Sequence, residues 1–181
     1  MKKHLLLFLL LAAFQGVTAQ QALLVKNVTL IDGNGGAPVA HTDILIKDGI
    51  IAETGHGLAA NGATVIDGAG KTVMPAIISS HVHIGMIKGN NNNTNPYTRE
   101  NILLQLKKYA AYGVTNVLVM GSDEPMLFKT GLRDSSVNGL LPGARLYSAG
   151  YGFTTPNGPP GMKYLNRPAT PAQAVAEMDS L

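Results

Sequence analysis

The pattern of hydrophobic and polar positions changes near Met74. Before it, short β-rich apolar runs alternate with polar turns, and three of these runs end at Asp32-Gly33, Asp48-Gly49 and Asp67-Gly68. Asp-Gly is the pair that tight hairpins favour, because glycine tolerates positive φ and aspartate caps the turn. The pattern therefore predicts a small antiparallel sheet over residues 20–74, which forms a β-sandwich portion.

After Met74, apolar strands alternate with segments that have helical spacing. Strands are expected over 75–83, 114–120 and 145–148, and helices are expected from Thr98 to Gly113, from Glu124 to about Leu132, and from Thr170 to the last residue, Leu181. Near-continuous apolar strands separated by helices are typical of a parallel α/β sheet or barrel. The predicted fold class is thus α/β, with the β-sandwich portion followed, over 75–181, by the first three βα units of an incomplete (β/α)8 TIM-type barrel.

Residues 1–19 have the three parts of a secretory signal peptide. Lys2 and Lys3 precede an apolar run from Leu5 to Phe14, and the small residue Ala19 permits cleavage after it. The alternative is an uncleaved membrane anchor, but ten apolar residues are fewer than the roughly 20 that span a bilayer. We therefore expect an exported, periplasmic protein that has no membrane partner after cleavage.

The amino-acid composition excludes several classes of functional site. The chain has 181 residues, of which 45% are hydrophobic, and its net charge of +3 falls to +1 when the two lysines of the signal peptide are removed (3 − 2). So small a charge predicts no nucleic-acid surface. Cysteine is absent, which excludes disulfides, thiolate metal ligands and a cysteine nucleophile. The sequence also lacks a Gly-x-Ser-x-Gly elbow and a phosphate-binding loop.

His81 and His83 are the strongest remaining chemical candidates. They are two residues apart at the end of an expected strand, so both imidazoles face the same way and Val82 faces the other. Such a pair can be half of a metal site, which needs about three or more ligands. The alternative is an ordinary core pair. His41 and His56, near turns of the first sheet, are interpreted as surface residues.

Several segments of the chain resemble a known superfamily. The stretch from Gly70 to His83 resembles the start of the barrel in the metal-dependent amidohydrolase superfamily, in its imidazolonepropionase-like and exported dipeptidase-like branch. Tyr112–Val117 resembles the segment that begins the second strand, and Pro142–Leu146 the segment before the third. Two positions depart from the pattern: Ala76 stands where glycine is usual, and Ser79 where aspartate is usual.

The resemblance implies a hydrolase that cleaves carbon–nitrogen, amide-type bonds of a small molecule through metal-activated water. It implies one or two divalent ions, with zinc expected, and His81 and His83 as ligands. The remaining ligands and the catalytic acid of the family lie on later strands, so no catalytic residue is assigned within this chain. We interpret the chain as an N-terminal fragment that is not expected to be active alone.

The unusual residues fall at the carboxyl ends of the expected strands, where barrel enzymes place their active sites. Besides the histidines these are Gly121–Asp123 and the loop Gly150–Pro168, and within this loop Tyr151, Phe153 and Asn157 are candidate substrate-binding residues. The same residues also suit ordinary loop packing. Two other hypotheses stay open: a truncated or vestigial, non-catalytic exported protein that binds metal weakly, and a β-rich periplasmic binding module. The oligomeric state is not predicted.

Overall fold

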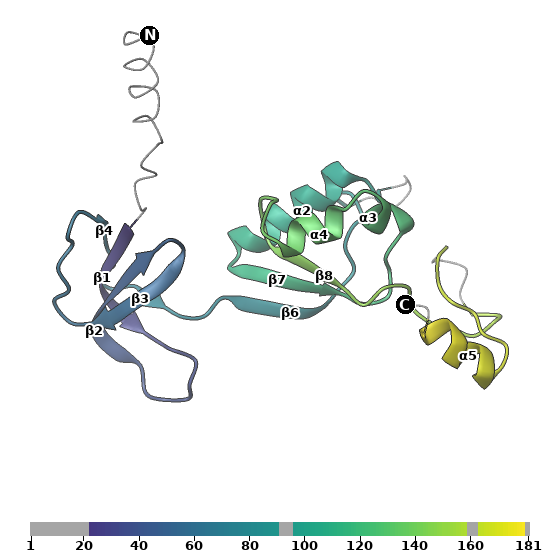
Figure 1. Ribbon diagram of the computed structural model, residues 1–181, viewed down its shortest axis with the longest axis horizontal. Coiled ribbons are helices and arrows are strands. Elements are labelled where there is room, and N and C mark those ends of the chain that lie inside the picture. Colours follow the sequence, from purple (N-terminus) through teal and green to yellow (C-terminus); the bar gives the residue numbers. More distant parts are fainter. Residues whose placement is uncertain (1–21, 91–95, 159–162, 180–181) are drawn as a thin grey trace, which may run out of the picture. The chain divides into compact units, whose positions relative to one another are not determined.

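The computed structural model describes residues 22–90, 96–158 and 163–179 (Figure 1). The chain divides into two compact units, Met1–Pro75 and Ala76–Leu181, each with its own sheet. The expected signal peptide lies outside the described residues. Among the helices of the described segments, none is long and apolar enough to cross a membrane.

The first unit is a five-stranded mixed sheet. Its strands are β1 (Ala22–Leu30), β2 (Val39–Lys47), β3 (Ile50–Gly55), β4 (Thr64–Asp67) and β5 (Thr72–Val73). Their order is β3-β2-β1-β4, and β5 also pairs with β1. The prediction of an antiparallel sheet is correct for β1, β2 and β3, but β4 and β5 run parallel to β1. In the described part of this unit the strands form a single sheet, so the second layer of the expected sandwich is not among these residues.

The three Asp-Gly pairs behave differently from one another. Asp48 and Gly49 have φ of 51° and 77° and join β2 to β3, as a type I′ hairpin turn requires. Asp67-Gly68 does not reverse the chain into a neighbouring strand; instead the Gly68 N–H donates to the Lys26 carbonyl at 2.8 Å and continues the parallel pairing with β1. Asp32 accepts from the Asn34 N–H at 2.9 Å at the start of the longer β1–β2 loop. Of the three pairs, Asp48-Gly49 forms a hairpin turn, whereas the other two do not.

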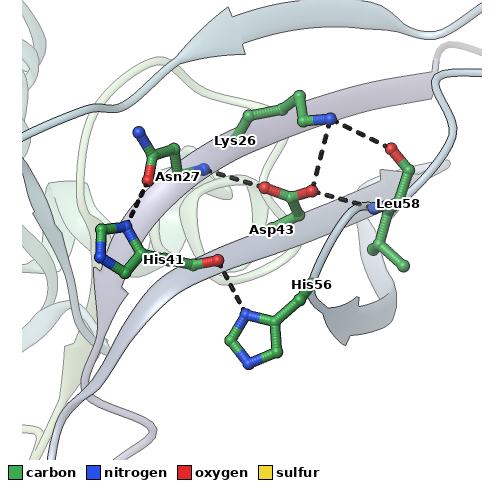
Figure 2. Close-up of polar contacts among 6 residues, drawn as sticks. All are labelled: Lys26, Asn27, His41, Asp43, His56 and Leu58. Carbon is green, nitrogen blue, oxygen red and sulfur yellow. Dashed lines mark hydrogen bonds and ion pairs between the residues drawn. The ribbon is translucent and has the colours of Figure 1, made fainter.

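A buried carboxylate lies between β1 and β2 (Figure 2). Asp43 is 3% exposed and accepts hydrogen bonds of 2.9 Å from the backbone N–H groups of Asn27 and Leu58, while the Lys26 ammonium lies 3.5 Å away. The Asn27 hydrogen bond is the main reason that the pKa of Asp43 is lowered. The sequence did not single out Asp43 as a structural residue.

The two histidines of this unit are exposed, as predicted, but each makes a hydrogen bond. His41 Nδ1 lies 2.8 Å from Asn27 Oδ1, and His56 Nδ1 donates to the His41 carbonyl at 2.9 Å (Figure 2). The register of β1 with β2 shifts between Val25 and Val28, which marks a bulge at Asn27, and these contacts join that bulge to the residue that follows β3.

The second unit is a three-stranded parallel sheet with helices. Its elements are β6 (Ile77–Val82), α2 (Arg99–Ala111), β7 (Val114–Val119), α3 (Pro125–Lys129), α4 (Leu132–Val137), β8 (Arg145–Ser148) and α5 (Pro171–Met178). The sheet order is β6-β7-β8, and both pairings are parallel, which confirms the predicted parallel sheet. The single helix expected over Glu124–Leu132 is instead two short helices on either side of Gly131. The last helix ends at Met178 rather than continuing to the last residue.

The core of this unit lies between the sheet and α2, α3 and α4, which cover the same face (Figure 1). Its fully buried side chains are Ile84, Ile102, Leu106, Val117, Val119, Leu127, Leu132 and Leu146. On β6, Ile77 and Ile78 stay 51% and 69% exposed. Because the strands are parallel, their carboxyl ends meet at one edge, and this edge carries the candidate site.

Candidate functional site

The two candidate ligands lie together at the end of β6. His81 Nε2 and His83 Nε2 are 3.3 Å apart, and the two rings meet edge to face at 80° with centroids 5.2 Å apart. Both side chains are exposed, whereas Val82 between them is 6% exposed and packs in the core. The strand alternation expected from the sequence therefore brings the imidazoles to one face.

The distance between the two Nε2 atoms suits a shared metal ion. In a tetrahedral zinc site, nitrogen ligands lie about 2.0–2.1 Å from the ion, so two of them are about 3.3–3.4 Å apart. The observed 3.3 Å matches this separation. In the described segments, however, no group of three or more His, Cys, Asp or Glu side chains could hold an ion. These residues thus fit one half of a tetrahedral site.

His83 is linked to the neighbouring strand. Its Nδ1 lies 3.0 Å from the hydroxyl oxygen of Ser122, which follows β7 and is 8% exposed. The sequence placed Gly121–Asp123 at the end of a strand, but gave Ser122 no role. The contact leaves Nε2 as the ring nitrogen that faces His81.

Asp123, next to Ser122, is a second buried carboxyl group. It is 3% exposed, and its Oδ2 accepts a hydrogen bond from the Ser148 hydroxyl at the end of β8. Its Oδ1 accepts from the Tyr97 hydroxyl at 3.4 Å. Burial raises the pKa of Asp123 above its usual value and raises that of Tyr97 as well. The carboxyl group therefore joins three segments at the strand edge.

A cavity of ≈ 230 Å³ opens beside these groups. It is lined by Ser122 and Asp123, and further by Gly85, Met86, Pro96, Tyr97, Gly121, Glu124, Lys163, Tyr164 and Leu165. It therefore has acidic, basic and aromatic side chains around the strand ends.

The three loop residues proposed from the sequence lie outside the lining of this cavity. Tyr151 packs edge-on against Phe128 with ring centroids 5.6 Å apart. Phe153 is 38% exposed, and Asn157 lies exposed in a turn. Their role in substrate binding stays a prediction.

Ser79 and Ala76, the two departures from the family pattern, lie near the same strand. Ser79 is half-buried within β6, and Ala76 is exposed just before it.

Comparison with known proteins identifies relatives. The dihydroorotase of Citrifermentans bemidjiense is 32% identical over 117 residues, which are 64% of this chain and 26% of that enzyme. The solved structure of molinate hydrolase is 25% identical, with a TM-score of 0.62 over 89% of this chain and 37% of its own. An amidohydrolase structure shares the fold, with 24% identity and a TM-score of 0.67 over 88% of this chain and 44% of its own.

No protein-family model matches the chain. The chain spans about a quarter of the length of the curated relatives it matches. Its relatives are hydrolases, and both the sequence similarity and the fold agree with the resemblance found at the β6 histidines. The chain is thus similar in sequence to dihydroorotases and in fold to amidohydrolase structures, which agrees with the resemblance to the amidohydrolase superfamily.

Proposed function

We propose that this protein is a metal-dependent hydrolase that cleaves a carbon–nitrogen, amide-type bond of a small molecule. The observation that carries the proposal is the 3.3 Å separation of His81 Nε2 and His83 Nε2 at the edge where the parallel strands end. A divalent ion, with zinc expected, would polarise the substrate carbonyl and activate water at this position. Relatives named as a dihydroorotase and a molinate hydrolase support this class of reaction.

The described residues have distinct tasks in this proposal. His81 and His83 hold the ion through Nε2, and the exposed position of both rings leaves room for further ligands and for substrate. The cavity beside Ser122 and Asp123 would receive part of a small-molecule substrate. The remaining ligands and the catalytic acid would come from later strands of a (β/α)8 barrel of the imidazolonepropionase-like or dipeptidase-like branch. Export to the periplasm by the signal peptide is part of the same proposal.

A second candidate is a non-catalytic exported protein that binds metal weakly. The observation that favours it is the ligand number: in the described part of the chain two side chains meet, whereas a catalytic zinc site has about three. The nucleotide sequence after the codon for Leu181 separates the two candidates. Codons for further histidines, a lysine and an aspartate at barrel-strand ends support the hydrolase, and a stop codon supports the non-catalytic protein.

Metal analysis of the full chain tests the site. We expect the wild-type chain to bind zinc in equilibrium dialysis and the double variant His81→Ala, His83→Ala to bind it more weakly. The matched control is His41→Ala, His56→Ala, which removes two exposed imidazoles from the other unit and is expected to retain the ion. Equal zinc in the wild type and the His81/His83 double variant would refute the ligand assignment.

A further inference from the structure

We propose that Ser122 is the positioning residue for His83: its hydroxyl oxygen accepts a hydrogen bond from His83 Nδ1–H and so keeps the lone pair of Nε2 free beside His81. The inference deepens the proposed metal site and rests on it. It concerns a residue for which the sequence pattern assigns no role, and it is carried by the 3.0 Å distance between His83 Nδ1 and Ser122 Oγ.

The two ring nitrogens of His83 have different neighbours, which leaves two arrangements of the single proton of a neutral imidazole. In one, Nδ1–H donates to Ser122, and Nε2 has a free lone pair. In the other, Ser122 donates to Nδ1, and Nε2–H points at His81 Nε2, 3.3 Å away. A metal ion can bind Nε2 only in the first, because the bond partner of one ring nitrogen decides the state of the other. The direction of the Ser122 hydrogen bond is therefore coupled to whether Nε2 of His83 has its lone pair free for a metal.

Ser122 is suited to this task because its backbone is fixed on both sides. Before it, the Gly121 carbonyl accepts from the Gly152 N–H at 3.0 Å, and a Cβ on Gly121 would lie 2.8 Å from the Gly152 Cα, so the two backbones are in direct contact. After it, the buried Asp123 is held by the hydroxyls of Ser148 and Tyr97.

Ser122 itself forms an isolated antiparallel bridge with Tyr151. The backbone that carries the hydroxyl is therefore held between the segments that follow β7 and β8, while the imidazole that the hydroxyl contacts comes from the end of β6. A hydroxyl held in this way fixes the ring orientation of His83 without placing a second charge beside the ion, unlike a carboxylate partner.

The test reads the protonated ring nitrogen directly, in the absence of metal. The full chain is labelled with 15N-histidine, and two-bond 1H–15N spectra are recorded at a pH where the imidazoles are neutral, with His83→Ala used to assign the signals. We expect His83 to carry its proton on Nδ1 in the wild type and on Nε2 in Ser122→Ala. Ser122→Thr, which keeps the hydroxyl, is expected to retain the wild-type pattern.

A matched control is Ser80→Ala, which removes an exposed hydroxyl from β6 on the face opposite to the histidines and is expected to change nothing. Amide spectra that overlay outside the strand edge show that the variants fold. In a competition assay against a chelator, Ser122→Ala is expected to bind zinc about 10–100-fold more weakly than wild type, the usual effect of removing such a partner.

A wild-type His83 with its proton on Nε2, or a Ser122→Ala variant that keeps it on Nδ1, overturns the inference. Measurable zinc binding of equal affinity in the wild type and Ser122→Ala overturns it too. A failure of the proposed function looks different: the wild-type chain then binds no zinc, while the 15N spectra still report the tautomer that Ser122 selects.

Discussion

Gly143 provides the sharpest test of how β8 is placed against α2. Its φ is 111°, and a Cβ at this position would lie 2.6 Å from the Leu106 carbonyl carbon and 2.7 Å from the Lys107 nitrogen, both of which are backbone atoms in the middle of α2. The next residue, Ala144, donates its N–H to the Leu106 carbonyl at 2.9 Å. The loop therefore contacts the helix backbone directly, and Gly143→Ala must push the two apart.

The expected cost has two parts. Positive φ costs a non-glycine residue about 1–2 kcal/mol, and overpacking against atoms that cannot move aside costs about 1–3 kcal/mol more. Gly143→Ala should thus lose about 2–5 kcal/mol of unfolding free energy. Gly113→Ala is the matched control, because Gly113 has φ of 80° at the end of α2 but nothing within 4 Å of a Cβ. It should lose only the part due to backbone strain, about 1–2 kcal/mol.

Urea unfolding, followed by circular dichroism, measures both variants. With a urea dependence of about 1.5 kcal/mol per M, the extra cost at Gly143 corresponds to a midpoint about 0.7–2 M lower than that of Gly113→Ala. Two variants with the same midpoint would refute the reasoning, since they would show that the contact with the α2 backbone relaxes without cost.

Two further predictions concern the buried carboxyl groups. Burial raises the pKa of Asp123, so the stabilisation by its protonated form is complete below about pH 3.8 and is lost as pH rises through the raised pKa. Asp123→Asn should therefore become more stable relative to wild type as the pH is raised from about 3.5 to 7. A constant difference in thermal midpoint between the two proteins across this range would contradict the prediction. The pKa of Asp43 is lowered, chiefly by the Asn27 N–H, so its stabilisation is present above pH 3.8 and is lost as pH falls through the lowered value. Asp43→Asn should unfold at a lower temperature than wild type at pH 7, with the difference shrinking below pH 3.8, and an unchanged midpoint at pH 7 would show that the two N–H bonds do not stabilise the sheet.

Local signals predicted the second unit well. The hydroxyl of Thr98 accepts from the Asn101 N–H at 3.2 Å and begins α2, and Gly113 follows its end with positive φ, as the sequence indicated. These signals act within a few residues of the elements that they bound. The apolar strands β6, β7 and β8 are long enough, and far enough apart along the chain, that parallel pairing was the expected arrangement.

In the first unit, local signals in the sequence did not predict which strands pair with each other. An Asp-Gly pair specifies a turn, but it does not specify which strand comes next to which, and β4 and β5 both pair with β1 across long stretches of sequence. Asp43 was missed for a similar reason. Its burial depends on a bulge in β1, where the register shifts between Val25 and Val28 and frees the Asn27 N–H to bind a carboxylate.

In the candidate site, too, some features follow from local signals in the sequence and others depend on contacts between strands. The His81 and His83 pair follows from strand alternation, which acts over two residues, whereas Ser122 is 39 residues away from His83 and meets it only because β6 and β7 are parallel neighbours. Asp123 and Ser148 repeat this arrangement between β7 and β8. Each contact joins adjacent strand ends within one three-stranded sheet, whose core against the helices is already buried. The orientation of His83 therefore rests on contacts within this one sheet, and these contacts hold its Nε2 beside that of His81.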